Sequence, residues 1–326
     1  MNYREMEKQD ALLRLIKVGG ILLVLIIGLL IFALKDRTKG DALWASEDLE
    51  DSIYLDGPDY EEMFHDNWIT YLHKAYIVFG EEPNFELYKI KSEFGRDDYD
   101  FEHDFYTGEG ENYRQRHENG VRASNSKTAI DVSEYQGEID WESVAASGVE
   151  TAIIRAGYRG YGSGEIGEDS MLFENLEGAR AAGLSVGVYF FSQAISYEEG
   201  VEEAEYVLNL IRDQKLDEPV VIDSEFIYGE DEGTARGNLI SAKERTDGIV
   251  GFCETVKNAG RTPMVYASKS WLFQENEFDR IGQYEIWLAA YYDDLVFPYH
   301  TEGWQYSPEG SVDGIDTVVD MNVWLR

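Results

Sequence analysis

The chain is poor in cysteine and histidine, and these shortages narrow the chemistry it can carry out. Its 326 residues include one cysteine, Cys253, so no disulfide can form within the chain and its redox compartment cannot be inferred. The neighbours of Cys253 predict a structural thiol on a buried helix face rather than a nucleophile. The five histidines show no metal-ligand spacing and no cysteine partner, which argues against metallopeptidases and thiol peptidases.

Basic residues are also scarce. Lys and Arg total 28 against 64 Asp and Glu, giving a formal net charge of −36. Nucleic-acid binding depends on neutralising phosphates with basic side chains, so this composition argues against a nucleic-acid partner. The net negative charge would also repel anionic lipids and wall polymers, so binding to such material must come from a shaped cleft. We expect most of the acidic residues to provide solubility.

One long apolar run is present near the N-terminus. The 17 residues of Val18–Leu34 are uncharged and lie at the short end of what spans a bilayer. Lys17 and Lys35 can extend their amines to the two membrane surfaces. A cleaved signal peptide is the alternative, but no Ala-x-Ala site follows. We expect an uncleaved transmembrane helix over 18–34, with residues 1–17 cytoplasmic and the remainder outside the cell membrane.

The region over 35–126 is rich in Asp, Glu and Tyr and predicts an extracytoplasmic stalk or linker. Asp59 and Glu62 have capping-box spacing, and apolar residues recur at helical intervals, so a helix is expected near 59–79. Such a helix must pack on the downstream domain or on a protein partner of residues 41–126. Residues 96–127 are polar and without periodicity, which is typical of a linker.

From Thr128 onward, short apolar strands alternate with amphipathic helices, a pattern typical of βα units. The expected strands are 129–132, 152–156, 185–191, 220–223, 263–266, 286–290, 303–306 and 318–321. The expected helices are 141–146, 170–182, 198–212 and 242–259. The last three strands have no helices between them. The fold class is therefore α/β, an irregular TIM-like β/α barrel over 127–326 that has lost its later helices.

Two carboxylates end the fourth expected strand. Asp223 and Glu225 follow the apolar residues Val220-Val-Ile222, and side chains two residues apart in a strand share one face. The C-terminal ends of barrel strands are where α/β enzymes place their chemistry. Glycoside hydrolysis uses two such acids, one protonated and one charged. A solvated strand end is the alternative interpretation of this pair.

Acids also lie on the first and last expected strands. Closure of the barrel makes these strands neighbours, so Asp131 and Asp320 should meet beside Asp223 and Glu225. Four converging carboxylates raise one another's pKa values and oppose folding. Active sites tolerate this when a protonated acid is required at neutral pH.

At this point the sequence resembles glycoside hydrolase family 25, the Chalaropsis-type N-acetylmuramidases. The resemblance runs in order from about Thr128 to the C-terminus. It is carried by Ala129-Ile-Asp-Val-Ser-Glu-Tyr-Gln-Gly137, Ile154-Arg-Ala-Gly-Tyr158, Gly187-Val-Tyr-Phe-Phe191, Val221-Ile-Asp-Ser-Glu225, Trp304-Gln-Tyr-Ser307 and Val319-Asp-Met-Asn322.

The resemblance implies an irregular barrel that cleaves the β-1,4 bond between N-acetylmuramic acid and N-acetylglucosamine in peptidoglycan glycan strands. It implies that Glu225 is the general acid and that Asp223 orients the substrate's acetamido group during its attack on the anomeric carbon. Asp131 and Asp320 match flanking carboxylates that shape the site. No metal or cofactor is implied. A family-typical wall-binding repeat does not follow the last motif, and we expect the membrane anchor to replace it.

Flat side chains near the strand ends could stack on sugar rings. The candidates are Tyr158, Tyr189, Phe191, Tyr291 and Trp304. Several of them could instead belong to the barrel core. Gln136 and Gln305 could bind substrate or tie down loops, and Arg155 is expected to pair with a barrel acid. The alternative function is a wall-binding or assembly scaffold that uses the same barrel without catalysis.

Overall fold

The computed structural model describes residues 76–80, 86–94, 114–117, 120–123, 126–229, 232–291 and 297–325. The chain divides into two compact units, Met1–His65 and Asp66–Arg326, and every described residue belongs to the second. The predicted transmembrane helix over 18–34 and the cytoplasmic segment over 1–17 lie outside the described residues. Among the residues that are described, no helix has the length and apolar character needed to cross a membrane.

Eight strands of the described chain close into a barrel. The neighbours in the sheet run β5, β13, β12, β11, β10, β9, β8 and β6, and β6 pairs with β5 to complete the ring. Their bounds are β5 Lys127–Val132, β6 Thr151–Arg159, β8 Ser185–Phe191, β9 Val220–Asp223, β10 Pro263–Ser268, β11 Glu285–Ala289, β12 Gly303–Gly310 and β13 Val319–Trp324. All pairings are parallel except those of β13, which runs antiparallel to β12 and β5. The expected TIM-like barrel is confirmed, and each predicted strand corresponds to an observed one.

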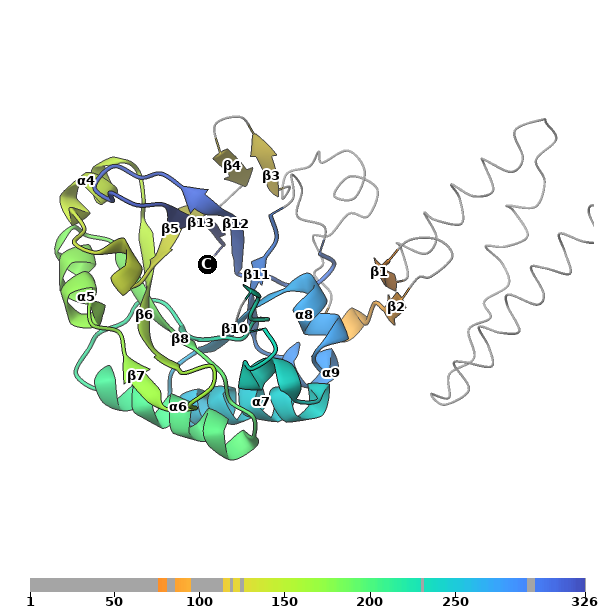
Figure 1. The fold of residues 1–326 in the computed structure, drawn as a ribbon. Helices are drawn as coiled ribbons and strands as arrows, with labels where there is room; N and C mark the ends of the chain where they lie inside the picture. The colour runs from red at the N-terminus through yellow and green to blue at the C-terminus, as the bar shows by residue number, and fades with distance from the viewer. Residues whose placement is uncertain are drawn as a thin grey trace, which may run out of the picture. The chain divides into compact units, whose positions relative to one another are not determined.

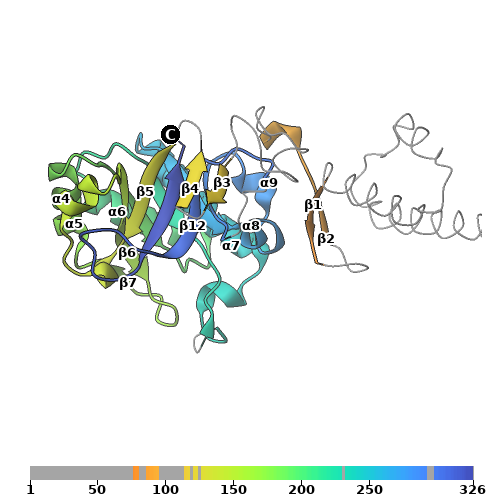
Figure 2. The ribbon, with the colours of Figure 1, turned by 90° about the horizontal axis from the view of Figure 1, so that it is seen from above.

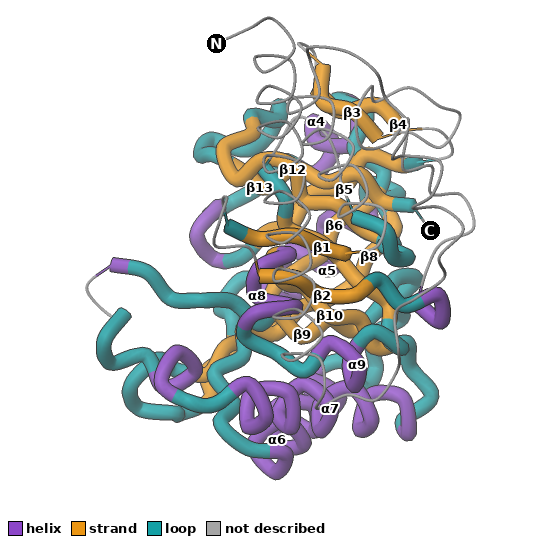
Figure 3. The backbone as a smooth tube through the Cα atoms, turned by 90° about the vertical axis from the view of Figure 1, so that its right-hand side faces the viewer, coloured by secondary structure: helices purple, strands orange, loops and turns teal. Residues whose placement is uncertain are grey.

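The helices lie outside this ring, as Figure 1 shows looking along the barrel. They are α4 Trp141–Ala146, α5 Leu172–Ala181, α6 Tyr197–Leu210, α7 Ala242–Asn258, α8 Lys269–Gln274 and α9 Phe278–Ile281. Figure 3 shows α6 and α7 together on one side of the strands. The four predicted helices are confirmed as α4 to α7, whereas α8, α9 and the short strand β7 (Ile166–Glu168) were not predicted.

Local signals explain where the helices begin and end. Side chains of Ser196 and Ser241 accept hydrogen bonds from the first turns of α6 and α7, and Glu244 completes a capping box on α7. Gly183 and Gly260 follow α5 and α7 with φ of 90° and 77°, a conformation that other residues seldom adopt.

Alternating side chains divide the barrel core into two layers. The interior layer holds Ala129, Ile153, Val221, Met264, Tyr266, Trp287 and Trp324. Their sequence neighbours, such as Ile154 and Ile222, face outward and pack under the helices. Strand β9 is covered on both faces, so it consists entirely of buried residues.

Part of the region before the barrel packs on it. Strands β1 (Tyr76–Phe79) and β2 (Glu86–Lys89) form an antiparallel hairpin beside α8 in Figures 1 and 2. The rings of Phe79 and Tyr88 contact Phe273 of α8, with centroids 6.4 and 5.7 Å away. The predicted helix near 59–79 lies mostly outside the described residues, and its last four residues form β1 instead. That part of the prediction was wrong because the apolar residues of β1 pack on the barrel and pair with β2.

The predicted linker over 96–127 also contains structure. Strands β3 (Arg114–His117) and β4 (Gly120–Ala123) pair as an antiparallel hairpin. The 3₁₀ helix η2 (Ser92–Phe94) precedes this segment, and the main-chain N–H of His300 donates to the carbonyl of Phe94. Part of the predicted linker is therefore folded as a hairpin rather than irregular.

Candidate active site

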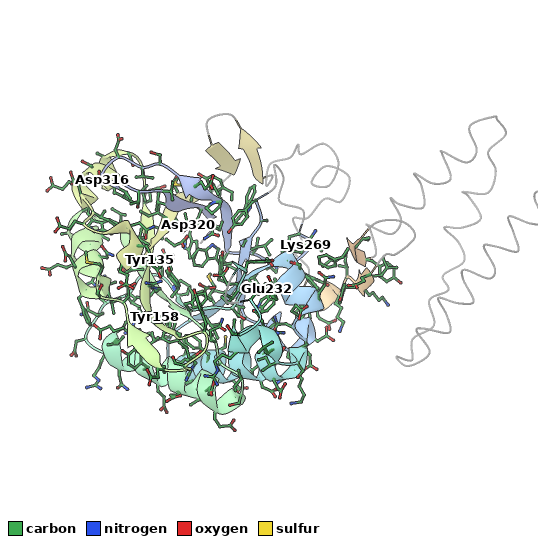
Figure 4. The ribbon with its side chains drawn as sticks, viewed as in Figure 1. Tyr135, Tyr158, Glu232, Lys269, Asp316 and Asp320 are labelled. Atoms are coloured by element: carbon green, nitrogen blue, oxygen red, sulfur yellow. The ribbon has the colours of Figure 1, made fainter. Side chains whose placement is uncertain are left out.

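A cleft of about 510 Å³ opens at the C-terminal ends of the parallel strands. The cleft is lined by all four predicted acids, Asp131, Asp223, Glu225 and Asp320. The prediction that these acids lie together is therefore confirmed. Asp131 on β5 and Asp320 on β13 are direct partners in the antiparallel ladder. Figure 4 shows Asp320 with Tyr135 and Tyr158, which line the same cleft from other elements.

Asp131 is held by two amides. Its Oδ2 atom accepts hydrogen bonds from Asn322 Nδ2 at 2.8 Å and Gln305 Nε2 at 3.0 Å. The amide oxygen of Asn322 in turn accepts from Trp287 Nε1 at 2.7 Å. The oxygen of Gln305 lies 2.6 Å from the hydroxyl groups of both Tyr266 and Tyr291.

Asp223 and Glu225 lack such support. Asp223 Oδ1 is buried and has no hydrogen-bond partner within the described residues. The side chain of Glu225 likewise has no hydrogen bond or ion pair to any described residue. Both residues line the cleft, and neither carboxyl group has a described hydrogen-bond partner that a bound molecule would have to displace.

Burial raises the pKa values of all four acids, and repulsion from neighbouring acids adds to the rise at Asp223, Glu225 and Asp320. Burial raises the pKa of Asp131 to about 6, against the stabilising amides of Asn322 and Gln305. Burial and the charge of Asp131 raise the pKa of Glu225 to about 7. Burial, Asp131 and Glu225 raise that of Asp320 to about 8. The pKa of Asp223 is raised by burial and by its three acidic neighbours. The site therefore retains protons at neutral pH.

Arg155 does not pair with any of these acids, contrary to expectation. Its Nε donates to Asp169 at 2.7 Å and its Nη2 contacts Glu134 at 3.1 Å. Its guanidinium lies 4.9 Å from the ring centre of Tyr135 and 5.5 Å from that of Tyr158. Asp169 follows β7, an element that was not predicted, and this explains the error.

The predicted aromatic residues fall into two groups. Tyr158, Tyr189, Phe191 and Tyr291 line the cleft. Trp304 does not: its side chain is completely buried in the outer layer, and its Nε1 donates to the carbonyl of Ala290 at 2.7 Å. The prediction that Trp304 stacks on sugar was wrong, because adjacent strand residues face opposite sides and Gln305 takes the inward position.

Gln136 also lines the cleft, and its contacts are structural. Its side-chain oxygen accepts from the N–H of Ser133, and its Nε2 donates to the carbonyl of Val318 at 3.2 Å. Of the two functions considered for Gln136, these contacts are those of a loop tie. Burial of Cys253 in α7 agrees with the predicted structural thiol.

Several cleft residues were missed by sequence reasoning. They are Tyr135, Tyr161, Tyr266, Trp287 and Asn322, of which all but Asn322 line the cleft directly. Asn322 carried a usable signal, because it lies two residues after Asp320 on one strand and shares its face. No group of three or more His, Cys, Asp and Glu side chains in the described ranges is arranged to hold a metal ion.

An acidic cleft with aromatic walls at the mouth of a β/α barrel defines the class as a glycoside hydrolase. Residues 130–315, more than half of the chain, match the profile of Glycosyl hydrolases family 25. The chain belongs to this family.

Two relatives are similar to part of the chain. The chain is 30% identical to the uncharacterized protein YegX of Escherichia coli K12, over 63% of this chain and 71% of YegX. It is 28% identical to an autolytic lysozyme of Clostridium acetobutylicum, over 59% of this chain and 54% of that enzyme.

Among solved structures, the modular autolysin LytC from Streptococcus pneumoniae matches with a TM-score of 0.57 and 28% identity. The match covers 65% of this chain and 49% of LytC, so the chain spans about half the length of that protein. LytC has also been solved in complex with synthetic peptidoglycan ligand.

Proposed function

We propose that this protein is a peptidoglycan hydrolase that cleaves the β-1,4 bond between N-acetylmuramic acid and N-acetylglucosamine. The observation that carries the proposal is the convergence of Asp131, Asp223, Glu225 and Asp320 in one aromatic-walled cleft. The two cleft arginines, Arg155 and Arg159, are each paired with other acids, and of the two only Arg155 lowers the pKa of a cluster member, Asp223, through its charge. The peptidoglycan complex of LytC and the autolytic lysozyme support the substrate class.

Glu225 is the proposed general acid. Its raised pKa of about 7 keeps a proton available near neutrality, and it has no described partner that would hold this proton elsewhere. Cleavage of a glycosidic bond leaves a poor alkoxide, so protonation of the bridging oxygen by Glu225 lowers the barrier. A positioned acid typically contributes about 10²- to 10⁴-fold in rate.

Asp223 is the proposed partner of the substrate's acetamido group. Asp223 lines the cleft and its carboxyl group has no described hydrogen-bond partner, so it can accept a hydrogen bond from a substrate N–H. A hydrogen bond from that N–H orients the acetamido oxygen for attack on the anomeric carbon. The positive charge that develops in this step favours the ionised form of Asp223.

The cleft aromatics are proposed to bind the sugars. Tyr158, Tyr291 and Tyr161 are 36%, 48% and 40% exposed, so their rings can accept a pyranose face without rearrangement of the core. Tyr189 and Phe191 are less exposed and line the deeper part. Asp131 and Asp320 complete the acidic floor.

Activity is tested by incubating the detergent-solubilised full chain with purified peptidoglycan and analysing the muropeptides. New reducing ends at N-acetylmuramic acid are expected. Glu225→Gln should lower turnover at least about 100-fold. Glu232→Gln is the matched control, since Glu232 is an exposed acid in the same β9–α7 connection (Figure 4). Tight glycan binding without product would instead favour the wall-binding scaffold, and normal cleavage by the Glu225 variant would refute its role.

Location at the cell membrane is a separate proposal. The apolar run Val18–Leu34 supports a single membrane-spanning segment, with its N-terminus cytoplasmic and the barrel outside. Attachment would hold the barrel at high local concentration near the wall. Fractionation of cells that express the full chain or a chain lacking residues 1–40 tests this. The full chain should stay with the membrane after carbonate washing, and the chain lacking residues 1–40 should not. If the two chains fractionate in the same way, the proposed membrane location is refuted.

A further inference from the structure

The two amides that contact Asp131 are each held in one orientation. A side-chain amide can present either its oxygen or its N–H₂ group to a neighbour. The indole Nε1 of Trp287 can only donate, and it contacts the oxygen of Asn322 at 2.7 Å. The N–H₂ group of Asn322 is therefore turned toward Asp131.

Gln305 is oriented by a similar argument. Its oxygen accepts from two tyrosine hydroxyls, those of Tyr266 and Tyr291, each at 2.6 Å. The opposite orientation would place an amide oxygen against the carboxylate of Asp131, where two acceptors would repel each other. Both amides therefore direct N–H groups at one oxygen of a buried carboxylate, an arrangement that stabilises its charged form.

No other member of the acid cluster has comparable side-chain hydrogen bonds among the described residues, although the charge of Arg155 lowers the pKa of Asp223. Asp223 Oδ1 has no described hydrogen-bond partner, and Glu225 has no described side-chain partner. Negative charge in the cleft is thus stabilised most strongly on Asp131.

We propose that Gln305 and Asn322 are positioning residues that fix the negative charge of the acid cluster on Asp131 and thereby keep the transferable proton on Glu225. This inference rests on the proposed function, because it assigns a means of maintaining the general acid. Neither amide needs to touch the reacting atoms. They act through Asp131, whose charge opposes the ionisation of Glu225.

Other charged groups that face these carboxyls do not supply the same control. The titratable groups around Asp131 and Glu225 are Asp223 from β9, Asp320 from β13, Tyr189 from β8, Tyr266 from β10 and Tyr291 after β11. The tyrosines stay neutral near pH 7, since their pKa values are all raised. The cleft cations are Arg155, paired with Asp169 and Glu134, and Arg159, paired with Glu203 and Glu202.

Substitution of Gln305 tests the proposal through the pH profile. The alkaline limb of kcat/KM reports ionisation of the general acid in the free enzyme. Gln305→Leu removes a hydrogen-bond donor from Asp131, so the pKa of Asp131 rises above its wild-type value. Asp131 is then neutral over a wider pH range and no longer opposes the ionisation of Glu225. The alkaline limb is expected to move down by about one pH unit.

Gln305→Glu gives the matched comparison. The new side chain keeps an oxygen for the two tyrosines, and its protonated form still donates to Asp131. Its ionised form adds negative charge beside Asp131. The alkaline limb should therefore stay at its wild-type position or rise. Gln283→Leu, at an exposed glutamine outside the cleft, should leave the profile unchanged.

Carboxyl ¹³C NMR of the full chain gives a readout independent of turnover, with Glu225→Gln assigning the Glu225 signal. A lower titration midpoint for Glu225 in the Gln305→Leu variant supports the inference. An unmoved midpoint and alkaline limb, with only the rate or stability reduced, would overturn it. If Gln305→Leu does not fold, Trp287→Phe releases Asn322 and should shift the midpoint in the same direction. Failure of the wild type to cleave peptidoglycan would refute the proposed function alone, since the NMR titration still decides the role of the amides.

Discussion

Replacing Phe94 tests whether the segment before the barrel stabilises it. Phe94 ends η2, and its ring packs edge-on against Phe278 of α9 and against Tyr299, with centroids 5.5 and 6.1 Å away. Lys91 from the same segment adds an ion pair to Asp279 at 2.5 Å, and its N–H donates to the hydroxyl of Tyr299 at 2.9 Å. Phe94→Ala removes the aromatic contacts and leaves the polar contacts in place.

The expected loss follows from the burial of the ring. Truncating a fully buried phenylalanine to alanine costs about 3–5 kcal/mol. Phe94 is only partly buried, so roughly half of this, about 2 kcal/mol, is expected. Because 1 kcal/mol corresponds to about 2–4 °C in domains of roughly this size, Tm should fall by about 4–8 °C.

Differential scanning fluorimetry of the detergent-solubilised full chain measures this shift. Leu239→Ala is the control, because Leu239 is 67% exposed and its truncation should change Tm by less than about 2 °C. Cleavage at 25 °C should be unaffected by either change, since neither side chain lines the cleft. A Tm for Phe94→Ala equal to that of the wild type would show that the aromatic contacts of Phe94 add no stability. A barrel cut at residue 127 would expose Phe273, Phe278 and Tyr299 and is therefore unsuitable for these tests.

Two further predictions concern the buried acids and the aromatic residues. The pKa values of Asp131 and Asp320 are raised from 3.8 to about 6 and about 8, and those of Glu225 and Glu203 are each raised from 4.5 to about 7. Stability should therefore fall as pH rises from about 5 to 8. In this pH range the folded state holds protons that the unfolded chain has released, so Tm should be lower at pH 8 than at pH 5. Asp320→Asn should reduce this loss of stability. A higher Tm at pH 8 would contradict the prediction. Separately, Trp304→Phe should lower Tm without changing KM, whereas Tyr158→Ala should raise KM about 3- to 10-fold, equivalent to about 0.5–1.5 kcal/mol. Steady-state kinetics on soluble glycan fragments distinguish the two, and a KM effect from Trp304 would contradict its buried position.

The barrel could be predicted because its strands carry strong local signals. Val220-Val-Ile222 is apolar on both faces, which is the pattern of a parallel strand covered on both sides. Once Asp131 and Asp320 were assigned to the first and last strands, closure alone brought them together. The convergence of the acids could therefore be predicted from the order and closure of the strands, which the periodic pattern of apolar residues indicates.

The orientation of individual side chains was harder to predict. Trp304 and Gln305 are adjacent, and only the strand register decides which of them faces the cleft. Arg155 has several acids within its reach in sequence, and its choice of Asp169 depends on β7, a strand of three residues. Such short elements have too few residues to show a period. The hairpin β1–β2 was missed for a related reason, since its strands have four residues each.

The acid site and the barrel core form one continuous stack of side chains. Asp131 lies two residues beyond Ala129 on β5, and Asn322 lies two residues from Trp324 on β13, so each polar group stands directly above an interior apolar one. Gly303 leaves space for this stack, because a Cβ there would lie 2.6 Å from Trp324 and 2.7 Å from Trp287. Trp287 both packs in that interior and donates to Asn322, the amide that faces Asp131. A substitution that alters the packing of Trp287 must therefore also alter where the cleft holds its negative charge, so stability and pH dependence are expected to change together at this position.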